Sequence, residues 1–301
     1  MVKILVLGTS GMLGSMIFDY LRKNRDFSVH GTVRNQKYQT KNMLLFDAQH
    51  IKELDEKEIL DLKFDYIINA IGITKPFCKD NDPEGVKRAI AINAKFPWEL
   101  GDFGRKHGIK ILTIGTDCVY SGKVGKYTED MPHDPIDVYG KTKSLGEVFD
   151  GSTLTIRTSI IGPELKGETS FLLEWFLSQK EGGTIDGFEH HIWNGVTTLQ
   201  FAKICEKIIE SSSFDKLVQI SRVHHFTPNS TVTKYELMQI FSTVFKKKIK
   251  INRVNKPEQK LDRSLSTKFH ELQNLYPQQN MISAVEELRD YMVRSALWGK
   301  K

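Results

Sequence analysis

Long apolar runs are missing from this chain of 301 residues. No stretch approaches the ~20 consecutive apolar residues that a helix needs to cross a bilayer, so we expect no membrane contact. The chain starts with MVKILVLGTSG, in which a short apolar run ends at Gly8, whereas a signal peptide needs an apolar region of about 7–15 residues. We therefore expect a cytoplasmic protein rather than a secreted one.

Cysteine is scarce as well. The chain has three cysteines, Cys78, Cys118 and Cys205, and they form no CxxC pair. This small, odd number argues against a disulfide framework and fits a reducing compartment. The histidines lack partners at metal-ligand spacing, so no metal site is predicted.

A strong charge of one sign is also absent. The 43 basic and 37 acidic residues leave a net charge of +6. The densest basic run, Lys246-Lys247-Lys248, has no aromatic-rich or zinc-type motif beside it, so nucleic acid is not an expected partner. The mild positive charge favours a small anionic ligand instead.

Strand-like and helical segments alternate through the first half of the chain. We expect strands at 3–8, 27–33, 43–46, 64–71, 109–114 and 154–161, and helices at 12–21, 51–62, 85–106 and 139–149. This alternation predicts a parallel sheet that helices cover on both faces. Several strands, such as YIINAIG, are continuous apolar runs, which is typical of strands buried on both faces. The predicted fold class is therefore α/β, with a Rossmann-like, doubly wound parallel sheet.

The pattern changes after Gly162, where an irregular stretch begins. Beyond it we expect a helix at 197–209, a strand at 217–220, a helix that starts at a capping box in 233–236, and a last helix at 282–297. The predicted domains are a dinucleotide-binding domain at 1–162, to which 194–222 return, and a smaller substrate domain made of 163–193 and 223–301.

A glycine-rich turn, GTSGMLG, follows the first strand and opens the first helix. Glycines there let the strand turn sharply, let the backbone approach a pyrophosphate and let the helix pack close to the sheet. The start of the helix then offers N–H groups and a partial positive charge to the phosphates. The alternative is a turn without a ligand. The predicted dinucleotide site consists of Gly8, Ser10, Gly11, Met12, Leu13 and Gly14.

The end of the second strand favours NADP(H) over NAD(H). NAD-binding proteins usually carry an acidic residue there, which binds the ribose 2′-hydroxyl, and this chain carries Arg34 instead. A cation attracts the 2′-phosphate of NADP, and the missing acid removes a repulsion. The alternative is that Arg34 is only a surface charge.

Tyr139 and Lys143 form the second informative motif. They are four residues apart on a predicted helix and therefore share one face. A nearby ammonium lowers the pKa of a phenol from its usual value of ~10. The tyrosine can then exchange a proton with a carbonyl or alkoxide oxygen near neutral pH.

Polar or small residues end two neighbouring strands. Thr116 follows one apolar strand, and Ala70 and Gly72 follow the strand before it. Because ligands of parallel α/β sheets bind at these carboxyl ends, the Thr116 hydroxyl can bond the oxygen that Tyr139 protonates. We expect Ala70 and Gly72 to contact the cofactor, together with Asn93, a polar residue in an otherwise apolar helix.

Together these motifs resemble an extended short-chain dehydrogenase/reductase. The resemblance is greatest to the dTDP-4-dehydrorhamnose reductase family and its relatives that act on UDP-linked amino sugars. The matching segments are GTSGMLG, NAIG, GTDCVYSG, YTEDMPHDPIDVYGKTKSLGE and RTSIIG, followed by WNGVTTLQFAK and DRSLSTKF. They keep the family's order and span most of the chain.

The resemblance implies a role for each matching residue. Thr116 corresponds to the active-site Ser or Thr, Tyr139 to the catalytic tyrosine, and Lys143 to the lysine that also holds the nicotinamide ribose. Asp47 corresponds to an adenine contact, and Asp117 lies beside the sugar.

The resemblance also implies a reaction. This is the NADPH-dependent reduction of the C4 keto group of a UDP- or dTDP-linked 4-keto-6-deoxy sugar, which supplies deoxysugars for surface polysaccharide. Three alternatives stay open: a nucleotide-sugar epimerase, a bifunctional 3-epimerase/4-reductase, and a non-catalytic NADP-binding regulatory subunit. For the second, the candidate acid/base residues are His190, His191 and Cys118. A homodimer is a further option.

One position departs from related dehydratases, which carry Thr-Asp-Glu where this chain has Thr116-Asp117-Cys118. Without the glutamate, dehydration lacks its base. Rhamnose reductases usually carry an aromatic residue at position 118, so Cys118 indicates either a different sugar or altered packing.

Three later residues complete the expected substrate site. Arg157 binds a diphosphate or pairs within the protein, Trp193 stacks on a base or packs in the core, and Arg263 is another candidate for the diphosphate. The remaining tryptophans, expected in the core or at an interface, are Trp98, Trp175 and Trp298.

Overall fold

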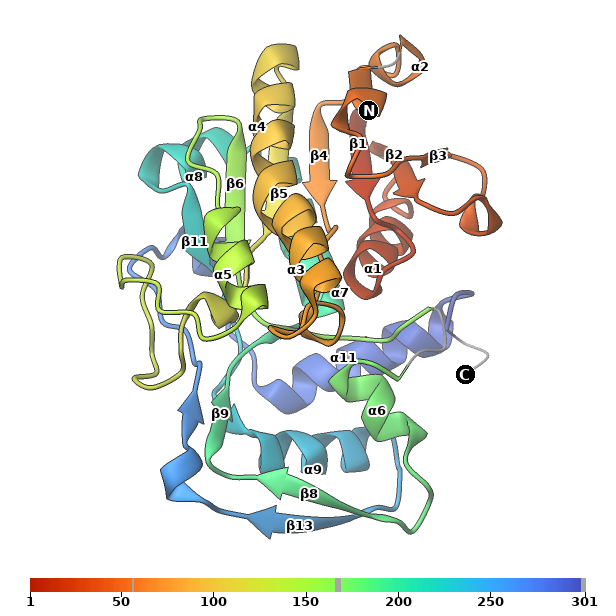
Figure 1. Ribbon diagram of the computed structural model, residues 1–301. Coiled ribbons are helices and arrows are strands. Elements are labelled where there is room, and N and C mark those ends of the chain that lie inside the picture. Colours follow the sequence, from red (N-terminus) through yellow and green to blue (C-terminus); the bar gives the residue numbers. More distant parts are fainter. Residues whose placement is uncertain (56, 166–168, 299–301) are drawn as a thin grey trace.

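A parallel sheet of seven strands, in the order β11-β6-β5-β4-β1-β2-β3, forms the centre of the computed structural model, which describes residues 1–55, 57–165 and 169–298 (Figure 1). The strand order reverses between β1 and β4, which is where ligands bind in doubly wound sheets. The predicted Rossmann-like α/β fold is confirmed. The strands are β1 (Val2–Leu7), β2 (Phe27–Val33), β3 (Met43–Leu45), β4 (Tyr66–Asn69), β5 (Lys110–Ile114), β6 (Thr153–Arg157) and β11 (Val223–His225).

Both faces of the sheet are buried because strand residues alternate between two apolar cores. In β1, Ile4 and Val6 pack into one core, while Leu5 and Leu7 pack into the other. This double burial explains the continuous apolar runs of the strands. The first core includes α1 (Met12–Leu21), α7 (Thr198–Glu210) and α8 (Phe214–Ile220), and the second includes η2 (Ile51–Asp55), α2 (Lys57–Leu60) and α4 (Phe96–His107).

The single helix predicted at 85–106 contains a π-helical turn. It consists of α3 (Pro83–Ala89), the π-helix η4 (Ile90–Lys95) and then α4. Pro97 accounts for the change, because it has no N–H for the carbonyl of Asn93 and its ring would collide with that carbonyl in a regular α-helix. A π-turn relieves the collision, and such turns are frequent at functional sites.

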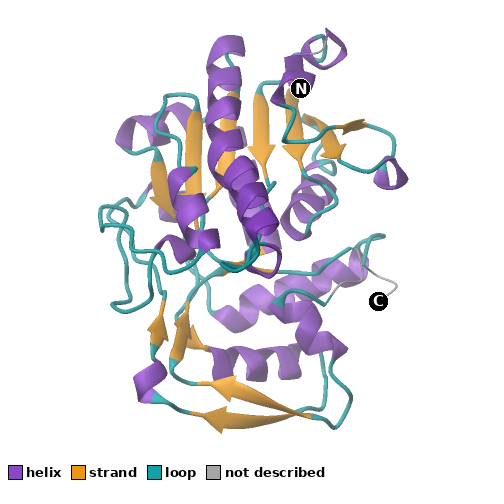
Figure 2. Cartoon of the chain, in the orientation of Figure 1, coloured by secondary structure: helices purple, strands orange, loops and turns teal. Residues whose placement is uncertain are grey.

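A smaller domain lies beneath the carboxyl edge of the sheet (Figure 2). In it, β8 (Thr184–Phe188) pairs with β13 (Lys250–Val254), and β9 (His191–Trp193) lies between β12 (Val232–Thr233) and β14 (Leu261–Asp262). The predicted capping box is present at the start of α9 (Lys234–Val244). The remaining elements of this half of the chain are α6 (Leu172–Ser178), η6 (Pro257–Gln259), α10 (Glu271–Leu275), which packs against α7, and α11 (Met281–Arg294), which packs against α9 and α7.

Shorter elements join the two domains or lie at the edge of the sheet. Two of them, β7 (Ile160–Ile161) and β10 (Val196–Thr197), pair in parallel. The others are η1 (Gln36–Tyr38), η3 (Lys75–Phe77), η5 (Asp117–Val119) and α5 (Val138–Leu145).

Three expectations for local structure are corrected. The strand predicted at 217–220 is part of the helix α8, because Phe214, Leu217 and Val218 are buried at helical spacing. The helix predicted at 51–62 consists of the short helices η2 and α2, and residue 56 between them lies outside the described residues. The segment 223–225 belongs to the large sheet, where β11 pairs with β6, and not to the smaller domain.

Within the described ranges, no helix combines the length and apolarity that a bilayer span requires. Trp298 packs in the core and is 2% exposed, whereas Trp98 and Trp175 are 44% and 37% exposed. A homodimer stays a prediction.

Replacing Gly146 by alanine should destabilise the junction between α5 and η4. A Cβ on Gly146 would lie 1.8 Å from the carbonyl oxygen of Asn93, whereas a Cβ on Gly151 would meet nothing within 4 Å. Because the backbone must shift to relieve this overlap, we expect Gly146→Ala to lose ~1–3 kcal/mol of unfolding free energy. The control Gly151→Ala should stay within about 0.5 kcal/mol of the parent. Urea unfolding measures both, and equal midpoints would contradict the close contact.

Candidate active site

The turn between β1 and α1 forms a cradle of the right shape for a pyrophosphate. Gly8 has a φ of +82°, a conformation that favours glycine. A Cβ on Gly14 would lie 2.3 Å from the carbonyl oxygen of Gly8. The third glycine of the motif is therefore required for α1 to pack directly against the end of β1.

The amino end of α1 presents free donors to this cradle. Within the described residues, the N–H groups of Met12, Leu13 and Gly14 have no acceptor, and the N-cap residue Gly11 provides no side-chain cap. The first turn carries no acidic residue, and half-buried Ser10 lies next to the N-cap. These residues fit the diphosphate of a dinucleotide, because N–H groups at a helix start bind anions.

The other predicted cofactor residues follow neighbouring strands at the same edge. Arg34 comes directly after β2, is exposed, and forms no ion pair with any described residue. Asp47 follows β3, and its Oδ1 accepts the amide of Gln49 at 3.0 Å. Ala70 and Gly72 follow β4. These four positions follow β2, β3 and β4 at the carboxyl edge of the sheet, which is the edge that carries the cradle.

Asn93 holds two segments of the site together. Its Oδ1 accepts the amide of Ile73 at 2.8 Å, and its side-chain amide donates to the Ile73 carbonyl at 2.8 Å and to the Thr142 hydroxyl at 3.2 Å. The side chain is 1% exposed. Asn93 was predicted to contact the cofactor, but both of its N–H groups bond to protein. It positions the β4–α3 loop against α5.

The three predicted catalytic residues converge at the carboxyl end of β5. Thr116 is 5% exposed, its hydroxyl donates to Asp117 Oδ1 at 3.3 Å, and it lowers the pKa of the nearby Tyr139 phenol. Lys143, one turn after Tyr139 on α5, donates from Nζ to the carbonyl of Ile114 at 2.8 Å. Helix α5 is thereby tied to β5 two residues before Thr116.

Burial is the largest influence on the pKa values of Tyr139 and Lys143. It raises the pKa of Tyr139 above the usual range of a phenol, Cys118 raises it further, and the Thr116 hydroxyl lowers it. Burial also lowers the pKa of Lys143 to about 8, against the opposing effect of Glu147. The expected acidification of Tyr139 by Lys143 is not among the largest influences on the phenol.

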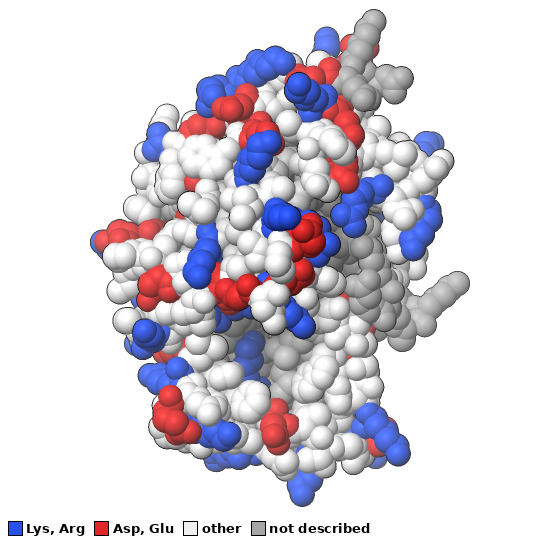
Figure 3. Space-filling model, in the orientation of Figure 1, with Lys and Arg blue, Asp and Glu red and all other residues white. Residues whose placement is uncertain are grey.

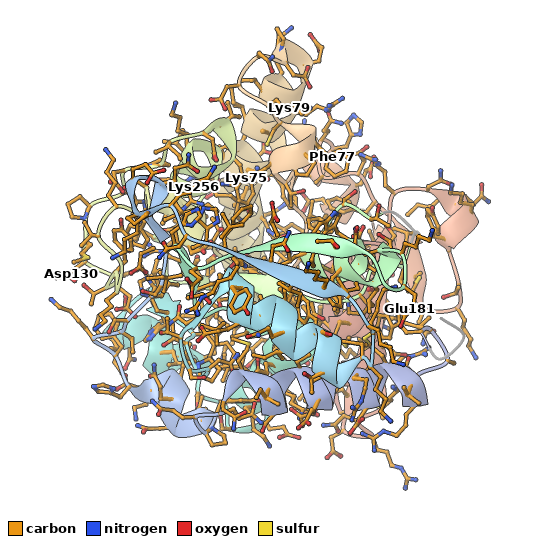
Figure 4. The ribbon with its side chains drawn as sticks, turned by 90° about the horizontal axis from the view of Figure 1, so that it is seen from below. Lys75, Phe77, Lys79, Asp130, Glu181 and Lys256 are labelled. Carbon is orange, nitrogen blue, oxygen red and sulfur yellow. The ribbon has the colours of Figure 1, made fainter. Side chains whose placement is uncertain are left out.

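Three basic residues act electrostatically on Asp117, and the sequence pointed to only one of them. Burial raises the pKa of Asp117, whereas Arg263, Lys234 and Lys75 lower it. Arg263 was predicted. Lys75 lies on the β4–α3 side of the cleft (Figure 4) and Lys234 is the first residue of α9. No spacing in the sequence links these segments, so no local signal could have found the two lysines.

The molecule is hollowed between its two domains, and basic side chains line the mouth of this hollow and lie inside it (Figure 3). Cys118, next to Asp117, is half-buried, and burial raises the pKa of its thiol to about 12. The thiol therefore stays protonated at neutral pH and does not serve as a base.

Arg157 belongs to the protein interior, which corrects its assignment to the substrate. It is 1% exposed, and all five of its N–H groups have acceptors. Two bonds of 2.9 and 2.7 Å join it to the Glu147 carboxylate, and the others reach the Tyr120 hydroxyl at 2.6 Å, His225 at 2.7 Å and His133 at 2.9 Å. No donor is left for a diphosphate.

Trp193 also belongs to the core, so the expectation that it stacks on a nucleotide base is wrong. Its side chain is 4% exposed, and the ammonium of Lys234 lies 4.4 Å from the centre of the ring. The neighbouring His190 is buried as well, and its Nδ1 accepts the amide of Lys256 at 3.1 Å.

A wide cavity of about 780 Å³ lies at the opposite, amino edge of the sheet, where Lys63, Tyr66 and Lys110 are among its lining residues. It contains none of the predicted catalytic or cofactor residues, so we place the site at the carboxyl edge. Within 1–55, 57–165 and 169–298, no three His, Cys, Asp or Glu side chains are grouped to hold a metal ion.

Comparison with protein families identifies one match. The family described as RmlD substrate binding domain matches residues 2–271 of the chain. Among curated relatives, the dTDP-4-dehydrorhamnose reductase of Aggregatibacter actinomycetemcomitans is 25% identical over 257 residues, which cover 83% of this chain and 81% of that protein. The methionine adenosyltransferase 2 subunit beta of Bos taurus is 22% identical over 253 residues, which cover 81% of this chain and 72% of that protein.

Solved structures share the fold across nearly the whole chain. A dTDP-4-dehydrorhamnose reductase ortholog from Clostridium acetobutylicum has a TM-score of 0.74 at 20% identity, covering 97% of this chain and 99% of that one. The dTDP-4-dehydrorhamnose reductase from Bacillus anthracis, in complex with NADP, has a TM-score of 0.72 at 18% identity, with the same coverage. At these identities the similarity shows the fold alone.

The Arg157 cluster predicts a loss of stability in mild acid. Burial and the adjacent Arg157 lower the pKa of His225 to about 4, below the usual value of ~6.5 for histidine. Between these values the unfolded chain binds a proton that the folded protein excludes, so stability falls as pH drops from about 6.5 to about 4. His225→Gln should weaken this dependence, whereas the exposed control His270→Gln should keep it. Urea midpoints measured from pH 7 to pH 4.5 test this, and a flat wild-type profile would refute it.

Proposed function

Because the chain belongs to the family of the RmlD substrate binding domain, we propose that it is an NADPH-dependent reductase that acts on the C4 keto group of a nucleotide-linked 4-keto-6-deoxy sugar. The observation that carries this proposal is the convergence of Thr116, Tyr139 and Lys143 at the end of β5. The open glycine cradle at the same edge supports it. The substrate is a UDP- or dTDP-linked sugar, and the product supplies deoxysugars for surface polysaccharide.

The chain's own residues handle the proton and the orientation of the carbonyl. When bound, the cofactor supplies the hydride to the carbonyl carbon. Tyr139 donates its proton to the carbonyl oxygen as negative charge develops there, and general acid catalysis of this kind is worth ~10²–10⁴-fold. Because the Thr116 hydroxyl acts on the pKa of the Tyr139 phenol, the two groups are close enough to bond the same carbonyl oxygen. The raised pKa of the phenol keeps it protonated and ready to act as an acid.

Lys143 has two tasks in this proposal. It holds α5 against β5 through the Ile114 carbonyl, which uses one of the three N–H groups of its ammonium. The remaining N–H groups are available to the hydroxyls of the cofactor's ribose. With a pKa of about 8, the side chain is largely charged at neutral pH.

Arg34 supports NADP(H) as the cofactor. It is exposed at the end of β2 and has no ion-pair partner among the described residues, so its guanidinium is free to bind the 2′-phosphate. The Bacillus anthracis reductase with a similar fold is in complex with NADP, which supports the same choice.

A non-catalytic NADP-binding regulatory subunit is the second candidate. It is favoured by the similarity to methionine adenosyltransferase 2 subunit beta from several vertebrates. A subunit that only binds has no need for the complete Thr–Tyr–Lys set, and this favours the reductase.

An epimerase that also acts at C3 would need a second acid or base. The Cys118 thiol stays protonated, so it could serve only as the acid, and His190 is buried, which leaves His191 as the candidate base.

Replacing Tyr139 by phenylalanine tests the catalytic assignment. We expect the rate of NADPH oxidation with a 4-keto sugar to fall roughly 10²–10⁴-fold, because no proton reaches the developing alkoxide. The affinity for NADPH should not change. Tyr276→Phe is a suitable control, because that tyrosine is also buried and its hydroxyl donates to Gln279 at 3.4 Å. Near-normal turnover by Tyr139→Phe would remove the reductase mechanism and favour a regulatory subunit.

Arg34→Ala tests the cofactor. The wild type should bind NADPH more tightly than NADH, and the variant should lose roughly tenfold of this preference, because a charge-assisted bond to the 2′-phosphate is removed. Arg25→Ala changes an exposed arginine just before the amino end of the same strand and should keep the preference. Fluorescence titration with both cofactors gives the two dissociation constants, and equal wild-type affinities would exclude the role of Arg34.

A further inference from the structure

Lys234 is a basic residue that acts electrostatically on Asp117 and that the proposed reaction does not use. It is the first residue of α9, directly after β12. In the antiparallel pair of β12 and β9, Thr233 lies opposite Ile192 and Val232 lies opposite Trp193. This pairing fixes the start of α9 beside the tryptophan, and the Lys234 ammonium lies 4.4 Å from the centre of the Trp193 ring.

The ammonium of Lys234 has no hydrogen-bond acceptor within the part of the chain that the structure describes. Burial lowers its pKa to about 8, while Asp117 and Cys118 raise it. A cation removed from water without a paired anion costs free energy. The side chain thus keeps all of its N–H groups available, close to the residues that directly follow Thr116.

Lys75 and Arg263, the two other cations that act on Asp117, differ in whether they already pair with an acidic side chain. Lys75 is paired with Asp137 at 2.8 Å, the residue that caps α5. Arg263 donates only to backbone carbonyls, from Nε to Tyr120 at 3.1 Å and from one terminal nitrogen to Ser121 at 3.5 Å. Its guanidinium therefore has further N–H groups to offer.

Charge at this point is unbalanced in favour of the cations. Lys75, Lys234 and Arg263 all act on the single Asp117 carboxylate. Asp137 pairs with Lys75 and is also influenced by Arg263, so three cations face two carboxylates. Burial, His190, Lys234 and Arg263 lower the pKa of His191, so this histidine is neutral at neutral pH and does not change the balance of charge. An anionic group that entered here would meet two incompletely used cations in a partly desolvated site, where charge-assisted bonds are strong.

We propose that Lys234 and Arg263 bind an anionic group of the substrate beside Asp117, either a phosphate of the nucleotide or a carboxylate on the sugar. This inference rests on the proposed function, because it assumes a nucleotide-linked sugar in the hollow. It assigns Lys234 to substrate specificity, a role that no motif of the sequence indicates. Neutral sugars without a nucleotide diphosphate should bind poorly.

Calorimetric titration of the NADP-saturated protein tests the inference. The probes are UDP, dTDP and uridine for the phosphate, and UDP-glucose and UDP-glucuronate for the carboxylate. Lys234→Met removes the charge but keeps most of the side chain, and Lys234→Arg restores the charge. Lys216→Met makes the first change at an exposed lysine of α8, in the sheet domain.

We expect Lys234→Met to weaken the binding of a charged probe at least tenfold, with Lys234→Arg within about threefold of the wild type and Lys216→Met unchanged. A loss for UDP or dTDP but not for uridine identifies the phosphate as the bound group. A loss confined to UDP-glucuronate, without a loss for UDP-glucose, identifies the carboxylate. Unchanged NADPH affinity and an unchanged melting temperature show that Lys234→Met is folded.

The inference is overturned if Lys234→Met binds every probe as the wild type does, or if the wild type binds none of them. The proposed function fails separately. If UDP binding depends on Lys234 but no 4-keto sugar causes NADPH oxidation, the anion site is supported and the reductase activity is refuted. If the protein reduces such sugars and Lys234→Met has no effect on binding or rate, the reductase activity is supported and the anion site is refuted.

Discussion

The close approach of α5 to the π-helix η4 is the constraint on which the site depends. Gly146 lies against the carbonyl of Asn93, and the Asn93 side chain bonds the Thr142 hydroxyl. Lys143 then ties the same helix to the end of β5. Together these contacts hold Tyr139 at Thr116, although the two residues belong to different segments of the chain. Pro97 contributes at a distance, because it favours the π-turn that sets the Asn93 carbonyl.

Two neighbouring groups of charged side chains differ in how completely their N–H groups are hydrogen-bonded. Around Arg157, every N–H group has a partner, and Arg157, Glu147 and His225 are all buried. Such a cluster is costly to disturb and has nothing left for a ligand. Around Asp117, the cations Lys234 and Arg263 stay incompletely paired. The contrast separates residues that serve the fold from residues that are available for binding.

Much of the fold could be predicted because it rests on local patterns. Continuous apolar strands alternate with amphipathic helices, and that pattern identified the doubly wound sheet. The prediction failed where a pattern was short. Four apolar residues at 217–220 fit a strand or a helix equally well, and only packing showed that Leu217 and Val218 lie on one face of α8. The helix at 85–106 was predicted, but its π-turn follows from a single proline that leaves the apolar periodicity intact.

The sequence by itself determined the features that depend only on residues close together in the chain. These are the glycine turn after β1, the single helical turn between Tyr139 and Lys143, and the polar end of β5. Such features depend on backbone conformation and on spacing within one element, which a sequence states directly. Only the tertiary structure decided that Arg157 and Trp193 belong to the interior and that Lys75, Lys234 and Arg263 meet at Asp117. Those contacts join segments that are far apart in the chain, so they depend on how the two domains pack and not on any local pattern.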